Sequence, residues 1–274
     1  MSVSEPNLAA WSNLPVTRHA PGGAGLPTSD AVAEETPVAL VYNGVAHAVM
    51  MATPLDLDDF GVGFSLSERI VDSAADIYDI DCVQTPGTVG IELRMTISGA
   101  CFMRLKEKRR SLAGNTGCGL CGLESLGALD TQLPPVTARA PVGKAALMAA
   151  FGALAPLQAL NALTGAVHAA AWAGPDGAIA LVREDVGRHN ALDKLIGALA
   201  RGGARRPGFA IMSSRASYEL VQKAARADIG LLATISAPTA LAVDMAERAG
   251  ICLVGFARQH GCVVYAHADR LLAA

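Results

Sequence analysis

Two stretches of the N-terminal half show the polar and apolar pattern of half-buried β-strands. The apolar runs 38–42 and 45–51 flank Asn43-Gly44, the dipeptide that most strongly favours a tight hairpin turn. Further on, apolar side chains occupy every second position from 89 to 97, which is the period of a strand with one buried face. A β-rich N-terminal part is therefore predicted.

Two helices are predicted in the sequence between and after these strands. Three aspartates begin a predicted helix that ends near Ser67, because acidic groups stabilise the positive end of a helix. A second helix is predicted at about 100–113, and it is basic: from Arg104 to Arg110 it carries five cations and one anion.

The C-terminal half is more regular and predicts a layered α/β sheet. A helical stretch at 142–163 and a strand at 167–173 come first. Three units of strand, polar loop and helix follow, with strands at 178–182, 209–212 and 231–235. The last strands are predicted at 251–256 and 262–265. Ligands in such sheets bind beyond the carboxyl ends of the strands, so the loops 184–194, 213–217, 236–239 and 256–261 are expected to form one anion-binding pocket.

Changes in composition and a proline-rich connection divide the chain into three predicted parts. Residues 1–36 are rich in Ala, Pro, Gly and Ser without a sustained period, and are expected to form a loose arm. Residues 37–133 form an N-terminal subdomain that contains the hairpin and the loop around Cys118. A proline-rich connection leads into an α/β core at 134–274, which is expected to bind a cofactor.

Charge and cysteine content narrow the class of protein. A net charge of −3 argues against general nucleic-acid binding. The uncharged stretch between Lys144 and Asp176 is interrupted by Gly, Pro, Asn and His, and is therefore expected to be buried rather than to span a membrane. No signal peptide pattern begins the chain, so its six cysteines are expected to stay reduced in the cytoplasm.

Cys118 and Cys121 are the residues with the most obvious chemistry. They lie in the glycine-rich run 114–122, just after the basic helix, and nearby positive charge favours the reactive thiolate. A half zinc site or an inert pair is an alternative, although no second Cys-x-x-Cys completes a zinc site. A thioredoxin-like role lacks the usual strand-to-helix context, and a zinc deaminase lacks its His-x-Glu motif.

The run 184–194 contains six charged or histidine positions in eleven. Its position between a predicted buried strand and an amphipathic helix favours a binding role over a solvated loop with surface ion pairs. His47 and His168 lie in apolar strands and are at least as easily explained by packing. The remaining cysteines are expected to be small core residues: Cys82, Cys101, Cys252 and Cys262.

Taken together, these motifs resemble the formate dehydrogenase accessory sulfurtransferases. The resemblance runs from about Pro37 to the C-terminus, and the segment 184–194 is its most specific part. The other matching motifs are Asn43-Gly44, 50–54, 118–122, 236–239 and 255–258.

This resemblance implies a cytoplasmic homodimer with a core similar to the cytidine deaminase fold. It implies a protein that takes sulfur from a cysteine desulfurase and delivers it to the bis-guanine-dinucleotide molybdenum cofactor, which formate dehydrogenase requires. Cys118 would carry the persulfide and Cys121 would assist. The cofactor-binding segment, which a guanine nucleotide could also occupy, would consist of Phe256, Ala257, Arg258, Gln259, His260 and Gly261.

Two other functions remain open at this point. A non-catalytic chaperone that binds the molybdenum cofactor would need the loops but not the thiols. A zinc-stabilised interaction module would need the thiols as metal ligands.

Overall fold

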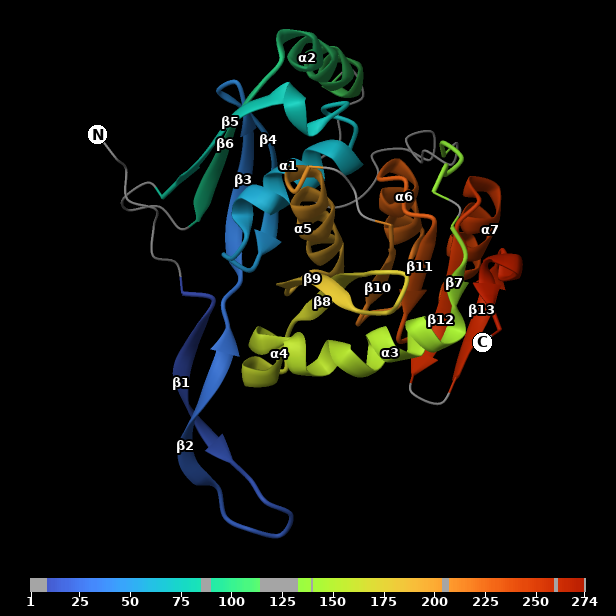
Figure 1. Cartoon of the computed structure of the whole chain (residues 1–274). Coiled ribbons are helices and arrows are strands. Elements are labelled where there is room, and N and C mark those ends of the chain that lie inside the picture. The colour runs from blue at the N-terminus through green and yellow to red at the C-terminus, as the bar shows by residue number, and fades with distance from the viewer. Residues whose placement is uncertain are drawn as a thin grey trace.

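The computed structural model describes residues 9–84, 90–113, 133–138, 140–203, 207–258 and 261–273. Cys118, Cys121, Gln259 and His260 lie outside these residues. The described chain forms a mixed α/β structure with two main sheets and a separate hairpin (Figure 1).

The larger sheet belongs to the C-terminal half and has six strands in the order β13-β12-β11-β10-β8-β9. The strands β10, β11 and β12 run parallel, while β8, β9 and β13 join by antiparallel pairing. The bounds are β8 His168–Ala173, β9 Ile179–Asp185, β10 Phe209–Met212, β11 Leu231–Thr234, β12 Cys252–Arg258 and β13 Gly261–Ala266. The predicted layered sheet is thus confirmed.

Helices cover both faces of this sheet. One face is covered by α3, and α5, α6 and α7 cover the other. The bounds are α3 Lys144–Leu154, α4 Ala159–Thr164, α5 Arg188–Arg201, α6 Tyr218–Arg226 and α7 Ala240–Ala249. The single helical stretch predicted at 142–163 is two helices with a short 3-10 turn between them, because Pro156 cannot continue an α-helix.

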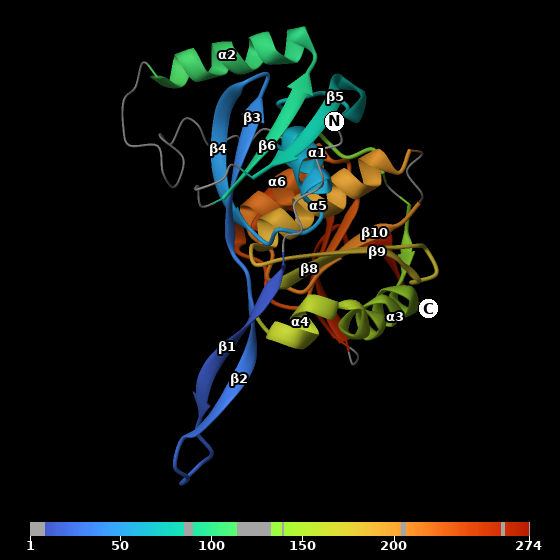
Figure 2. The same ribbon diagram turned by 90° about the vertical axis from the view of Figure 1, so that its left-hand side faces the viewer.

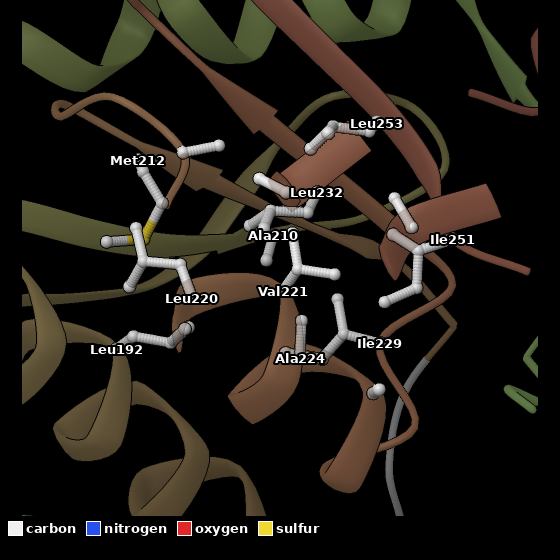
Figure 3. Close-up of a cluster of buried hydrophobic side chains, with 14 of the residues drawn as sticks. Leu192, Ala210, Met212, Leu220, Val221, Ala224, Ile229, Leu232, Ile251 and Leu253 are labelled. Atoms are coloured by element: carbon white, nitrogen blue, oxygen red, sulfur yellow. The ribbon is translucent and has the colours of Figure 1, made fainter. Parts of the chain in front are cut away.

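The core between the sheet and the helices α5–α7 is built from alternating strand residues and one face of each helix. Ala210 and Met212 point from β10 toward Leu220 and Val221 of α6, with Leu192 of α5 beside them (Figure 3). Burying a side chain such as Leu or Val contributes about 1.5–3 kcal/mol. The four alanines of β8, Ala169, Ala170, Ala171 and Ala173, are buried and leave room for the layers to approach closely.

The second sheet lies in the N-terminal half and has the order β4-β3-β6-β5. Its elements are β3 Thr36–Tyr42, β4 Val45–Ala52, α1 Leu57–Ser67, β5 Ile77–Val83, β6 Ile91–Ile97 and α2 Gly99–Ala113. The hairpin predicted at Asn43-Gly44 is confirmed: both residues have positive φ, 46° and 78°. The Asn43 side chain also bonds both backbone groups of Ile97, at 2.7 and 3.1 Å, and so fixes the turn to β6.

The two halves meet where α1 packs along α5 (Figure 2). Glycines make this contact possible, because a methyl group on Gly63 would overlap the backbone carbonyl of Asp193. In the same way, a methyl group on Gly197 would overlap the carbonyl of Asp59. The helices are therefore in backbone contact, and the N-terminal sheet is held against the core.

The expectation of a loose N-terminal arm is wrong for residues 11–33. These residues form an antiparallel hairpin, β1 Trp11–Arg18 and β2 Leu26–Ala33, that extends away from the body (Figures 1 and 2). Most of its residues are exposed on both faces. Without a buried face there is no alternation of apolar residues, and the sequence therefore carried no strand signal.

The remaining short elements are two-residue strands and 3-10 turns: β7 Val142–Gly143, β14 Leu271–Leu272, Ala74–Asp76, Ala155–Leu157 and Ala268–Arg270. In the described part of the chain, no helix is both long and apolar enough to cross a membrane. The predicted domain boundaries and the likeness to the cytidine deaminase fold stay predictions.

Candidate functional site at the carboxyl edge of the sheet

One edge of the six-stranded sheet collects the ends of four strands. The strands β9, β10, β11 and β12 all end there, and α5, α6 and α7 begin there. We call the segments 185–190, 213–219, 235–240 and 256–258 the carboxyl edge. Backbone hydrogen bonds join neighbouring segments: Thr239 donates to Ala216 at 3.0 Å, and Phe256 donates to Ser236 at 3.4 Å. The described parts of the four predicted loops therefore lie together.

The carboxyl edge is suited to anions. The N-termini of three helices point their free N–H groups toward it, and these groups carry partial positive charge. Arg188 is the first residue of α5, while Arg215 and Arg258 are exposed after β10 and at the end of β12. The Thr239 side chain caps α7 by accepting a hydrogen bond from the Ala242 N–H at 3.3 Å.

His189 links the starts of α5 and α6. Its Nε2 lies 2.7 Å from Oε2 of Glu219 and 3.3 Å from the Ser217 hydroxyl. Because both partners contact the same ring nitrogen, the three residues cannot work as a serine-nucleophile relay, which needs one partner on each nitrogen. Burial lowers the pKa of His189 to about 4, outweighing the opposite pull of Glu219. At neutral pH the ring is therefore neutral and donates to the carboxylate.

The segment 184–194 contributes a buried network behind this edge. Asp185 and Lys194 form an ion pair at 2.7 Å, and neither side chain is exposed. Asp185 also accepts hydrogen bonds from the N–H groups of Thr53 and Gly187, at 3.0 and 2.8 Å. Asn190 donates to Asp185 at 3.0 Å and to the carbonyl of Met51 at 2.7 Å.

Lys194 completes the same network from the other side. Its ammonium group donates to the carbonyl of Thr53 at 2.9 Å and to that of Glu184 at 3.2 Å. Burial lowers the pKa of Lys194, and the nearby Asp185 opposes that shift. The sequence motifs 50–54 and 184–194 therefore meet in space through buried polar contacts.

A second buried cluster joins α1, α5 and α6. Asp193 accepts from the Ser67 hydroxyl at 2.7 Å and pairs with Lys223 at 2.9 Å. Burial raises the pKa of Asp193 to about 6, while the carboxylates of Asp193 and Glu68 raise the pKa of Lys223 against its own burial. A third cluster places Asp59 of α1 at 2.7 Å from two guanidinium groups.

These clusters show that some residues of the segment 184–194 have a structural role, while others lie at the carboxyl edge. The alternative of a solvated loop is wrong, because Asp185, Asn190, Asp193 and Lys194 are buried. They join the two halves of the molecule. Glu184 accepts from the N–H groups of Leu160 and Asn161, both at 2.9 Å, at the start of α4. Arg188 and His189 are left at the carboxyl edge, and a binding role for them stays a prediction.

The structure describes part of the predicted site. Phe256 is exposed with a left-handed φ of 50°, Ala257 is buried, and Arg258 is exposed opposite Gly261. These residues end β12 at the carboxyl edge. Their predicted partners Gln259 and His260, and both thiols Cys118 and Cys121, lie outside the described residues.

Other cysteines and potential metal ligands lie elsewhere. Cys101 and Cys252 are buried as expected, whereas Cys82 and Cys262 are only partly buried at the edges of their clusters. The ligand atoms of Asp72, Asp76 and Cys101 lie close together. The guanidinium group of Arg104 already binds two of these residues: it donates to Asp72 at 2.7 Å and to the Cys101 sulfur at 3.2 Å. A cation there would compete with a guanidinium.

Comparison with known proteins decides the family. Residues 33–272 match the model of the FdhD/NarQ family. The chain belongs to this family. It is 51% identical over 268 residues to a sulfur carrier protein FdhD of Bordetella petrii, covering 97% of this chain and 96% of the relative. It is 56% identical over 243 residues to that of Cupriavidus necator, covering 88% and 84%. The resemblance inferred from the motifs is thereby confirmed.

A solved structure shows the same fold. A crystal structure of a candidate formate dehydrogenase accessory protein from Desulfotalea psychrophila superimposes with a TM-score of 0.75. It is 24% identical and covers 96% of this chain and 100% of that chain.

Sequence reasoning missed two features of the site. The contact of His189 with Glu219 joins residues from two helices, and no local sequence pattern predicts it. The contact of Thr53 with Asp185 spans 132 positions. Its only sequence signal was that both motifs belonged to the same family resemblance.

Proposed function

We propose that this protein is a sulfur carrier for the maturation of formate dehydrogenase. The observation that carries the proposal is the identity of 51–56% to relatives named sulfur carrier protein FdhD, over most of each chain. In this proposal the protein receives sulfur from a cysteine desulfurase and delivers it to the bis-guanine-dinucleotide molybdenum cofactor. It acts in the cytoplasm as a homodimer.

Cys118 receives the sulfur in this proposal. Its thiolate attacks the outer sulfur of the desulfurase persulfide, the old S–S bond breaks, and the donor cysteine leaves as a thiolate. The new persulfide then resides on Cys118. Basic residues shortly before this position in the sequence, from Arg104 to Arg110, favour the thiolate form. Cys121 is positioned in sequence to assist the onward transfer.

The carboxyl edge is the proposed place for the cofactor, which is the substrate here. Its two nucleotide diphosphates carry several negative charges, and three helix N-termini with Arg188, Arg215 and Arg258 offer complementary charge. Phe256 is exposed beside them and offers a surface on which a guanine ring can stack. A free guanine nucleotide should occupy the same place.

The test is a comparison of cysteine variants in a strain that needs this protein to make active formate dehydrogenase. Cys118→Ala should abolish the formate dehydrogenase activity. Cys262→Ala, which removes a partly buried thiol in β13, should retain it and serves as the matched control. Full activity with Cys118→Ala would refute sulfur transfer through this residue and favour a chaperone that only binds the cofactor.

A further inference from the structure

The basic helix α2 lies at one end of the molecule, across the end of the N-terminal sheet (Figures 1 and 2). The carboxyl edge lies toward the opposite end. Within its 15 residues α2 carries five basic side chains and one acidic side chain, although the whole chain has a net charge of −3. Among residues 99–107 of α2, the buried side chains are Cys101 and Leu105, and Phe102 is partly buried against the same cluster.

A cavity of about 190 Å³ opens beside α2. Phe64, Ile70 and Leu105 form its apolar wall, and the charged groups Glu68, Arg69 and Arg104 also line it. We call this cavity, together with the neighbouring residues 103–107 of α2, the α2 surface. The volume is sufficient for one or two side chains of a partner protein.

The charges of the α2 surface favour an acidic ligand. Glu68 is neutralised within the molecule by Lys223 at 2.9 Å and Arg226 at 3.8 Å, and Arg104 is neutralised by Asp72 at 2.7 Å. Arg69 is exposed, and among the described residues no carboxylate pairs with it. The ammonium group of Lys106 lies 4.4 Å from the centre of the Phe102 ring, and this cation–π contact keeps the positive charge close to the surface of α2.

The position of α2 in the chain indicates which partner this is. The helix ends at Ala113, five residues before Cys118. Five residues of extended chain span at most about 17 Å. A protein bound to the α2 surface can therefore approach the thiol that the proposed function loads with sulfur.

We propose that the α2 surface is the docking site for an acidic segment of the protein that donates sulfur to Cys118. This inference rests on the proposed function. An acidic side chain enters the cavity beside Arg69, and a further acid of the segment pairs with Lys106 on α2. Opposite charges speed the encounter and orient the partners, so the interaction weakens as salt rises.

The experiment compares two sulfur donors. A double variant, Arg69→Glu with Lys106→Glu, is loaded with radioactive sulfur either by the cysteine desulfurase or by glutathione persulfide. Loading by the desulfurase should become at least tenfold slower at low salt, whereas loading by glutathione persulfide should be unchanged. The control Arg248→Glu makes the same kind of charge change at an exposed position of α7 and should leave both rates unchanged.

The outcomes separate docking from chemistry. If the double variant is loaded by the desulfurase at the wild-type rate, the docking proposal is wrong. Equal slowing with both donors would also overturn it, because the defect would then lie in the thiol or the fold. If wild-type protein takes sulfur from neither donor, the proposed function itself fails. Binding of a heptaglutamate peptide then still tests the surface, and equal affinity for wild type and double variant would exclude an acidic ligand.

Discussion

Removing the ammonium group of Lys194 should show how strongly the buried network joins the two halves of the protein. Lys194→Met keeps a side chain of similar length and apolar stem but deletes the charge. The change removes the 2.7 Å ion pair with Asp185 and the hydrogen bonds to the carbonyls of Thr53 and Glu184. Asp185 then stays buried without its countercharge.

The expected magnitude follows from what Asp185 retains. Removing one partner of a buried ion pair typically costs about 3–5 kcal/mol, because the other charge is left uncompensated. Asp185 would still accept three hydrogen bonds, from Thr53, Gly187 and Asn190. These donors continue to stabilise the carboxylate, so we expect the lower end of the range, about 3 kcal/mol. That loss should lower the melting temperature by about 6–12 °C.

Urea unfolding followed by circular dichroism measures this change. Lys144→Met is the matched control, because Lys144 is exposed at the start of α3, and it should change stability by less than about 0.5 kcal/mol. Adding Asp185→Asn to Lys194→Met should recover part of the loss, since the orphaned charge is removed. If Lys194→Met is as stable as the control variant, the reasoning about this network is wrong.

Two further predictions concern helix packing and pH. Gly63→Ala and Gly197→Ala should each destabilise the protein by about 1–3 kcal/mol, because the new methyl group forces α1 and α5 apart. Gly152 lies in α3, and a methyl group added there would contact nothing within 4 Å. Gly152→Ala should therefore stabilise the protein by up to about 1 kcal/mol in the same unfolding assay. Equal effects at all three glycines would contradict this explanation. For His189, the folded pKa of about 4 lies below the usual value of 6.5, so its contribution to stability is present above pH 6.5 and is lost as the pH falls toward 4. His189→Gln should therefore lose less stability than wild type between pH 7 and 4.5, and parallel losses would show that the ring does not titrate in this way.

Much of the fold could be predicted from local patterns. Asn43-Gly44 predicted the β3–β4 hairpin because its two positions need positive φ, which Gly and Asn tolerate best. The strand and helix units of the C-terminal half were found because the strands are short apolar runs, fully buried in β10 and β11, and the helices each bury one face. Two elements were missed for the opposite reason. The hairpin at 11–33 has no buried face, and β5 alternates poorly between exposed and buried positions.

The predicted ends of some strands were wrong where polar residues continue a ladder. The strand predicted at 178–182 extends as β9 to Asp185, because Arg183 and Glu184 pair with Ala170 and Ala169 of β8. Polarity alone suggested that the loop had begun. Only the pairing with the neighbouring strand decides whether such residues belong to the sheet.

The sequence by itself determined the family and the α/β class, because these depend on residue identity, spacing and local periodicity. The order of acidic and basic residues in the motif 184–194 is specific enough to indicate the family. Only the tertiary structure decided which charged residues of that motif are buried in ion pairs and which lie at the carboxyl edge. Asp185 and Lys194 are buried against Thr53, whereas His189 reaches the carboxyl edge. The physical reason is that burial and ion pairing depend on partners distant in the chain, and a local pattern does not contain those distances.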